Sequence, residues 1–127
     1  MIIVVIHWKI KRKQKWVDKF LEFWRKTATV EDRSGLIGEF LSEGHSTAEF
    51  DWITWPLTGC EEKYRSFVNV GFWNSAEEFQ EQIGKYFKPS GGLEKFEAKP
   101  RQRTALKPKC WRVGDNKLPI HDSGGVL

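Results

Sequence analysis

The chain has 127 residues, of which 39% are hydrophobic, and it carries a formal net charge of +4. This length suits one domain with a single core and excludes an enzyme built from separate cofactor and substrate domains. Its longest unbroken apolar run, residues 2–6, is far shorter than the roughly 20 residues that span a membrane. No charged leader precedes that run, so we expect a soluble, cytoplasmic protein with no membrane partner.

Charge is distributed unevenly along the chain. Residues 1–30 hold eight Lys and Arg against two acidic residues, residues 31–87 hold four against eleven, and residues 88–127 hold nine against four. Basic ends favour either an anionic partner or simple neutralisation of the acidic middle. No run reaches the five or six like charges of an interaction tail, which favours neutralisation.

The first 43 residues predict a strand, a helix and a second strand. Residues 2–11 alternate apolar and polar side chains and are rich in β-branched residues, which is typical of a central strand. Residues 14–28 repeat apolar side chains every three or four positions and predict an amphipathic helix whose aromatic face lies on a sheet. Residues 34–35 (Ser-Gly) break that pattern before a strand over 36–41.

The middle of the chain predicts an arm and a third strand. Residues 44–63 contain glycines, a proline and the aromatic stretch Phe50–Trp55, so we expect an inserted arm or lid rather than a tight hairpin. In residues 64–73 the odd-numbered and the even-numbered positions both carry apolar side chains. Both faces of this strand should therefore be covered.

A second helix and a fourth strand complete the predicted domain. Ser75 can cap a helix, and the Glu78 side chain can hydrogen-bond back to Ser75. One stripe of this helix carries Phe79, Ile83, Tyr86 and Phe87. The fourth strand should lie near 103–106 or 109–113, where Pro100 and Pro108 confine it to an edge or interrupt it. Residues 114–127 look like an extended tail.

The order β-α-β-β-α-β predicts an α+β fold of the ferredoxin-like type with an antiparallel sheet. We expect one domain over residues 1–113. Two helices cover one face of such a sheet and leave the other face in need of a cover. We expect Phe67 and Trp73 on that open face, under a second copy of the chain or a ligand.

Cysteine and histidine do not indicate a metal site. Cys60 and Cys110 lie far apart with no CxxC motif, and their redox state is left open. His7, His45 and His121 are equally scattered. We therefore predict no metal.

Three segments resemble the antibiotic biosynthesis monooxygenase-like (ABM) family, part of the dimeric α+β barrel superfamily. They are residues 1–10 (MIIVVIHWKI), 34–38 (SGLIG) and 67–79 (FVNVGFWNSAEEF), the last similar to a family strand followed by Trp-x-Ser-x-x-x-Phe. The resemblance extends over residues 1 to about 87. It leaves the arm and the chain after residue 113 unexplained.

This resemblance implies a homodimer in which two antiparallel sheets form an α/β barrel, with a pocket between sheet and helices in each protomer. It implies a cofactor-independent monooxygenase acting on a small aromatic substrate. Some members degrade haem, but Ile6, Gln82 and Gly92 occupy the positions of their haem-degrading residues. We therefore expect no haem and no other cofactor.

The candidate site residues combine aromatic walls with a few polar groups, as a pocket for an apolar ligand requires. Candidate catalytic residues are His7 and Asn69. Candidate substrate-binding residues are Trp8, Phe67, Trp73, Gln82 and Tyr86. Each also has a simpler interpretation, as a core, interface or solvent-facing residue.

Two other classes of function stay open. One is a non-catalytic, ligand-binding or stress-associated dimer with the same barrel fold. The other is an RNA-recognition module, because residues 65–72 resemble the aromatic strand that stacks bases. Ser66, Val68 and Asn69 depart from that signature at its informative points, so a nucleic-acid partner is not expected.

Overall fold

The computed structural model describes residues 1–27, 31–57, 63–88 and 92–116. The chain is an α+β protein with a four-stranded antiparallel sheet and two α-helices. Its elements are β1 (Ile2–Lys11), α1 (Gln14–Glu22), the π-helical segment η1 (Phe23–Thr27), β2 (Leu36–Glu43), β3 (Tyr64–Trp73), α2 (Ala76–Ile83), the 3-10 segment η2 (Gly84–Tyr86) and β4 (Glu97–Leu106). The predicted element order is confirmed.

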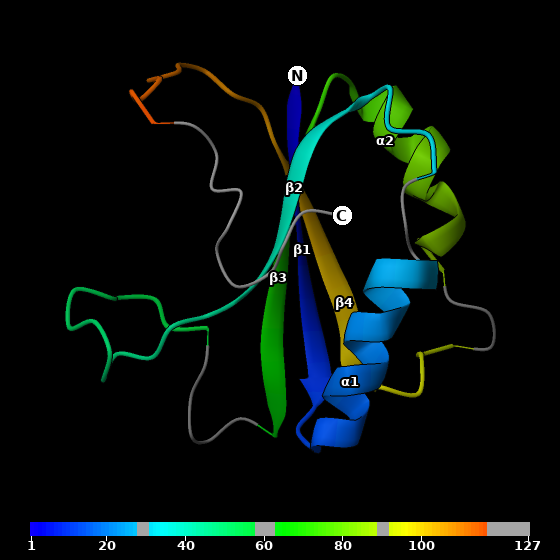
Figure 1. Ribbon diagram of the computed structural model, residues 1–127, viewed down its shortest axis with the longest axis vertical. Helices are drawn as coiled ribbons and strands as arrows, with labels where there is room; N and C mark the ends of the chain where they lie inside the picture. Colours follow the sequence, from blue (N-terminus) through cyan, green and yellow to red (C-terminus); the bar gives the residue numbers. More distant parts are fainter. Residues whose placement is uncertain (28–30, 58–62, 89–91, 117–127) are drawn as a thin grey trace.

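The strands lie in the order β2-β3-β1-β4, and every neighbouring pair is antiparallel. This arrangement is compatible with the ferredoxin-like fold. Both helices lie on one side of the sheet, as Figure 1 shows. The central position predicted for residues 2–11 is confirmed, because β1 pairs with both β3 and β4.

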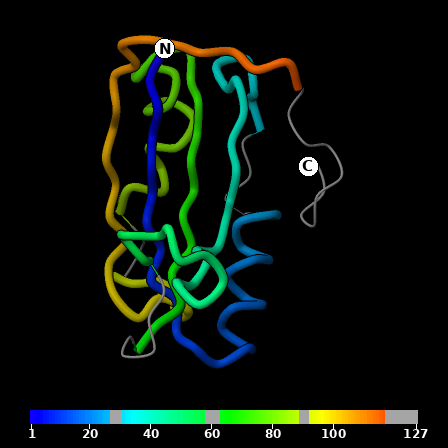
Figure 2. The backbone as a smooth tube through the Cα atoms, turned by 90° about the vertical axis from the view of Figure 1, so that its left-hand side faces the viewer, coloured from blue at the N-terminus to red at the C-terminus, as the bar shows by residue number. Residues whose placement is uncertain are grey.

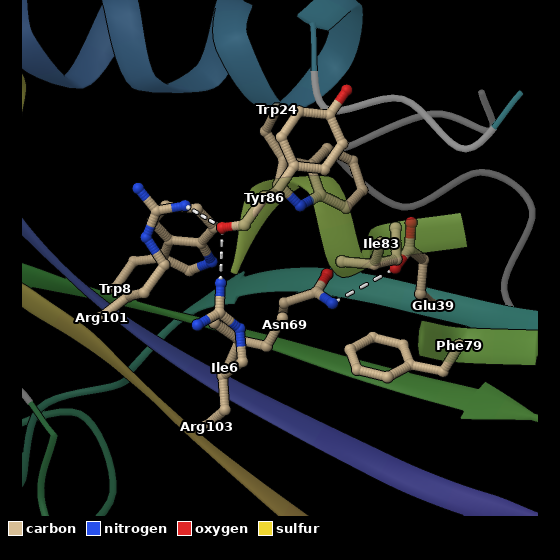
Figure 3. Close-up of a pocket in the computed structure, with 10 residues that line it drawn as sticks. All are labelled: Ile6, Trp8, Trp24, Glu39, Asn69, Phe79, Ile83, Tyr86, Arg101 and Arg103. Atoms are coloured by element: carbon tan, nitrogen blue, oxygen red, sulfur yellow. Dashed lines mark hydrogen bonds between the residues drawn. The ribbon is translucent and has the colours of Figure 1, made fainter. Parts of the chain in front are cut away.

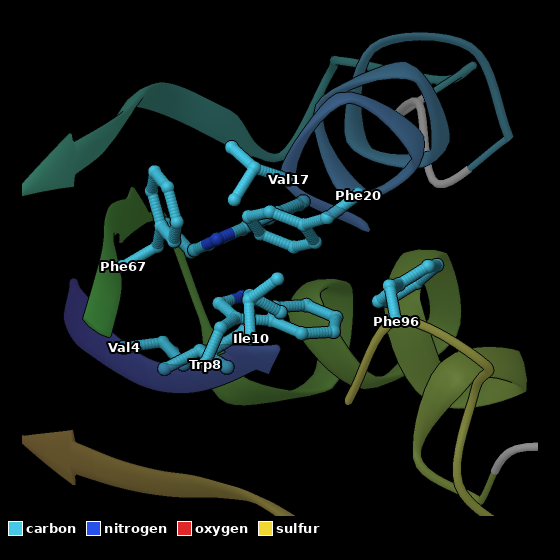
Figure 4. Close-up of a cluster of buried hydrophobic side chains, with 9 residues drawn as sticks. Val4, Trp8, Ile10, Val17, Phe20, Phe67 and Phe96 are labelled. Atoms are coloured by element: carbon cyan, nitrogen blue, oxygen red, sulfur yellow. The ribbon is translucent and has the colours of Figure 1, made fainter. Parts of the chain in front are cut away.

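The core lies between the sheet and α1. The even-numbered side chains of β1 point into it, and Val4, Ile6, Trp8 and Ile10 are all buried. Phe20 of α1 is fully buried against them, with its ring centroid 5.0 Å from that of Trp8 (Figure 4). The Phe20 ring also contacts the rings of two further core residues, Phe67 and Phe96.

Helix α2 begins at the predicted cap. The Ser75 hydroxyl oxygen accepts a hydrogen bond from the backbone N–H of Glu78, at 3.2 Å. The returning bond differs from the expected one, because the Glu78 carboxylate accepts from the Ser75 hydroxyl at 3.0 Å. The two acidic residues in the first turn also favour the positive end of the helix.

The expectation that Phe67 and Trp73 lie on the open face is wrong. Both are buried on the helix-covered face, where the Trp73 ring packs against Phe79 of α2 with centroids 5.5 Å apart. The antiparallel register causes this, because Trp8 lies opposite Phe67 and has its side chain in the core. The alternate β3 residues Val68, Val70 and Phe72 therefore face away from the helices.

Strand β4 begins earlier than expected. It covers Glu97–Leu106, whereas residues 109–113 form no strand. Pro100 falls where the pairing of β1 with β4 shifts register, between His7 and Lys9. This position is tolerated because β4 is an edge strand, as predicted.

The arm and the chain after β4 project from the same side of the sheet, opposite the helices (Figures 1 and 2). Residues 44–57 contain turns but no helix or strand, and Trp52 and Trp55 are exposed there. Residues 107–116 pass across the other end of this face, and Trp111 contacts Phe72. The predicted helix end at 28, residues 58–62 of the arm and residues 117–127 of the tail lie outside the described residues.

We expect Gly35→Ala to destabilise the fold, because its new Cβ would lie 2.7 Å from Glu78 Cβ. Such overpacking costs about 1–3 kcal/mol in the free energy of unfolding, measurable by urea denaturation. Gly38→Ala is the matched control, since nothing lies within 4 Å of its Cβ. Equal stabilities of the two variants would contradict the close approach of Gly35 to α2.

Candidate functional site

A small cavity lies between the sheet and the helical layer (Figure 3). Its volume is about 30 Å³, which is room for about two water molecules. Its walls come from four strands and three helical segments: Ile6, Trp8, Trp24, Glu39, Asn69, Phe79, Ile83, Tyr86, Arg101 and Arg103.

The strands β1 and β3 supply two buried polar side chains to this cavity. Trp8 is 4% exposed and Asn69 is 5% exposed. The Asn69 amide donates a hydrogen bond to Glu39 Oε2 at 3.2 Å, whereas Asn69 Oδ1 has no hydrogen-bond partner. Trp8 Nε1 also lacks a partner. One buried acceptor and one buried donor are therefore left for a ligand or water.

Glu39 brings a carboxyl group to the cavity from β2. It lies opposite Gly71 in the sheet and is half-buried. Burial raises the pKa of Glu39, whereas the bond from Asn69 and the charge of Arg33 lower it. The net shift is upward, so Glu39 holds a proton to higher pH than an exposed glutamate does.

Strand β4 contributes a buried ion pair. The Arg101 guanidinium bonds both oxygens of Glu97, and the side chains are 4% and 0% exposed. Arg101 also lies over the Trp8 ring, 4.2 Å from its centroid. This cation–π contact and the ion pair fix the planar group against one wall.

Arg103 is the second cation at this wall. Its terminal nitrogens donate to the backbone carbonyls of Tyr86 (3.0 Å) and Phe87 (3.5 Å), but its buried Nε has no partner. Burial lowers the pKa of Arg103, and repulsion by Arg101 lowers it further, while Glu97 opposes both effects.

The helical layer reaches the cavity where its winding changes. Trp24 lies in the π-helical segment η1, and Tyr86 ends the 3-10 segment η2. Phe23 packs edge-on against Tyr86, with ring centroids 6.2 Å apart. In Figure 3 the Tyr86 ring lies beside Trp24 with its hydroxyl pointing away from the sheet residues, whereas the Tyr86 backbone oxygen accepts hydrogen bonds from Arg101 and Arg103.

An apolar groove adjoins the cavity between α2 and β4. Its volume is about 280 Å³, and its lining is Ile2, Val4, Ala76, Phe79, Gln80, Phe87, Arg103, Thr104 and Ala105. Phe79 and Arg103 line both hollows. The polar cavity therefore meets a larger apolar space at these two side chains.

The structure brings three of the sequence-predicted site residues together: Trp8, Asn69 and Tyr86 line the cavity. Phe67 and Trp73 are core residues outside its lining.

Two further candidates lie elsewhere. Gln82 donates to Asp32 at 3.1 Å and does not line the cavity. His7 points to the opposite face of the sheet, where its Nε2 lies 2.9 Å from the Ser66 hydroxyl. His7 and Asn69 are therefore not brought together.

Sequence reasoning missed Trp24, Glu39, Arg101 and Arg103 as site residues. The sequence of β4 held a signal, because Glu97, Arg101 and Arg103 are all odd-numbered and so point to the same face of a regular strand. The proline and register shift in this strand hide that signal, since they remove a continuous alternation.

Two kinds of feature would bear on function in the parts of the chain that the structure describes, a cluster of metal ligands and a membrane-spanning helix. No group of three His, Cys, Asp or Glu residues there could hold a metal ion. No helix in those same ranges is long and apolar enough to cross a bilayer. Cys110 is exposed and unpaired with another cysteine, whereas Cys60 and His121 lie outside the described residues.

Comparison of the chain with models of known protein families finds no match, and no curated protein matches it. The chemistry of the cavity therefore has to be inferred from its own side chains.

We expect Glu39→Gln to stabilise the protein increasingly as pH rises. Below the ordinary pKa of glutamate both forms are neutral and similar. Above the raised native pKa, the parent must bury a carboxylate, and its free energy of unfolding falls relative to the variant. Urea denaturation from about pH 4 to about pH 8 measures this difference. Exposed Glu81→Gln is the control, and a pH-independent difference for Glu39→Gln would contradict the burial effect.

Proposed function

We propose that this chain is an ABM-like protein that binds a small aromatic ligand at the cavity, as a cofactor-independent monooxygenase. One observation carries the proposal: Asn69 and Trp8 line the same aromatic-walled cavity, and Asn69 Oδ1 and Trp8 Nε1 are buried without hydrogen-bond partners. Leaving a buried polar atom unsatisfied costs about 1–3 kcal/mol. A ligand oxygen that both accepts from Trp8 and donates to Asn69 recovers that energy.

The surrounding side chains suit an aromatic ligand. Rings of Trp8, Trp24, Phe79 and Tyr86 form much of the walls, and Glu39, Asn69, Arg101 and Arg103 supply the polar groups. The cavity is too small for a ring system, so the body of the ligand occupies the adjoining groove. Its reactive edge then reaches Asn69, and the polar groups among the aromatic walls give orientation.

The chemistry requires a proton acceptor and no bound metal. Glu39 accepts a hydrogen bond from Asn69, and its raised pKa makes it a stronger base than an exposed glutamate. The substrate supplies the electrons: a CH₂ group activated by phenolic rings loses two hydrogens and becomes a carbonyl. One atom of O₂ enters that carbonyl, and the other leaves as water with the two hydrogens.

The open sheet face supports a homodimer of the kind the resemblance implies. It carries Ile3, Val5, Val70 and Phe72 on the two central strands and Phe40 on β2. Phe40 is 38% exposed, although it belongs to this apolar row. Residues 107–116 cover one end of this face, where Trp111 contacts Phe72, and packing two such faces together would remove the rest of the row from water and close a barrel.

A non-catalytic binding protein with the same fold is the second candidate. The position of His7 favours it, because this histidine lies on the face of the sheet opposite the cavity. A binding protein needs the groove and the unpartnered polar atoms, but it does not need Glu39 as a base.

We expect oxygen uptake with a panel of polyphenolic and quinol substrates. Asn69→Ala should lower kcat/KM by about tenfold or more, because the group that orients the reacting oxygen is lost. His7→Ala is the matched control and should stay within about twofold, since its ring lies behind the sheet. An oxygen electrode measures both rates.

Binding of panel members without oxygen uptake would favour the binding protein. Equal loss of activity in Asn69→Ala and His7→Ala would contradict the assignment of the site to the cavity. Circular dichroism of both variants establishes that they are folded.

We expect the chain to sediment at twice its monomer mass. Val70→Glu places a charge in the centre of the open face and should shift the species toward the monomer, as analytical ultracentrifugation would measure. Lys85→Glu, on the exposed surface after α2, should leave the dimer intact. A parent protein that stays monomeric at all concentrations would contradict the barrel.

A further inference from the structure

Arg103 occupies the boundary between the cavity and the groove. Its side chain lines both, and its guanidinium lies 5.1 Å from the Phe87 ring centroid. Two of its nitrogens are engaged by backbone carbonyls, which leaves Nε as a buried donor without a partner. A charged group therefore has unused hydrogen-bonding capacity where the two hollows meet.

The charges that β4 brings to this wall do not balance. Arg101 and Arg103 lie near one another, and Arg101 engages both oxygens of their shared carboxylate neighbour, Glu97. Among the residues that the structure describes, Arg103 forms no ion pair. Carbonyl dipoles satisfy two of its donors but do not cancel a full charge. Burying such a cation is costly unless an anion accompanies it.

The groove beside Arg103 is apolar and small. Ile2, Val4, Phe79, Phe87 and Ala105 supply most of its surface. Its volume of about 280 Å³ lies near the lower end of the ~300–1,000 Å³ typical of ligand pockets, which suits one or two rings. Such a groove takes the uncharged body of a ligand, and Arg103 is the only charged side chain among its lining residues.

We propose that the groove between α2 and β4 binds a small aromatic anion, with its rings on Phe79 and Phe87 and its anionic oxygen on Arg103. This inference rests on the proposed function, because it names the chemical class of the ligand for the same site. The anionic oxygen completes the ion pair that Arg103 lacks and accepts a hydrogen bond from its guanidinium. A carboxylate and an ionised phenol share this chemistry.

Two pairs of probes test the charge requirement by isothermal titration calorimetry at low salt and mildly alkaline pH. Naphthoate is compared with uncharged naphthamide, and para-nitrophenolate with uncharged para-nitroanisole. Each anion should bind at least about tenfold more tightly than its neutral counterpart. A preference in only one pair identifies whether carboxylate or phenolate is the anion that the site accepts.

Variants connect that preference to Arg103. In Arg103→Gln the anion preference should fall to within about twofold, while affinity for the neutral probes stays the same. Arg103→Lys keeps the positive charge and should retain part of the preference. Arg25→Gln removes an exposed arginine from η1 and should change nothing.

The outcomes separate this inference from the proposed function. Neutral probes that bind as tightly as the anions would overturn the charge requirement and leave the aromatic site standing. A preference that survives in a folded Arg103→Gln would also overturn it. If no probe binds the parent protein, both proposals fail. The comparison of probes on the parent decides the matter even where a variant does not fold.

Discussion

The alternation of side chains along β1 is the constraint on which both faces of the molecule depend. Its even-numbered residues point to the helices, and its odd-numbered residues point to the open face. Because β1 pairs with β3 and β4, residues that lie opposite each other on these strands point to the same face of the sheet. Asn69 and Arg103 each lie opposite Ile6. One row across three strands thus places an amide and a guanidinium at the cavity. A slip of one residue would exchange them for the residues now facing away.

The edge strand combines a protective role with the site. Charged side chains that point inward discourage a sheet edge from pairing with another chain, and β4 carries three of them, Glu97, Arg101 and Arg103. Burying them requires partners, and Trp8 and the Tyr86 carbonyl provide part of what is needed. Arg103 alone is left incompletely satisfied. The inward-pointing Arg103, which protects the edge, therefore also offers a ligand a hydrogen-bond donor that no group in the described part of the chain uses.

Elements with a single strong period could be predicted from sequence, and those without one could not. The alternation of side chains in β1 and the capping residues of α2 predicted where these two elements lie in the chain. The phase of β3 could not be chosen, because both parities are apolar and only the pairing of Trp8 with Phe67 decides it. In the site, Asn69 was predicted as the polar residue of an apolar row. The arginines were missed because charged side chains are usually exposed, and burial depends on partners that are distant in sequence.

The charge of the ligand and the proton of Glu39 are linked, because Glu39 and Arg103 line the same cavity. Without a ligand, the charge of Arg33 and the hydrogen bond from Asn69 partly oppose the effect of burial, which raises the pKa of this carboxyl group. An anion on Arg103 adds a negative charge to the same cavity, and a nearby like charge raises the pKa of a carboxyl group further. Glu39 then ionises only at a higher pH, and it is a stronger base once ionised. A neutral ligand adds no such charge and leaves the pKa of Glu39 where burial sets it. The ionisation state of the bound ring therefore determines the pH at which this site removes a proton from its ligand.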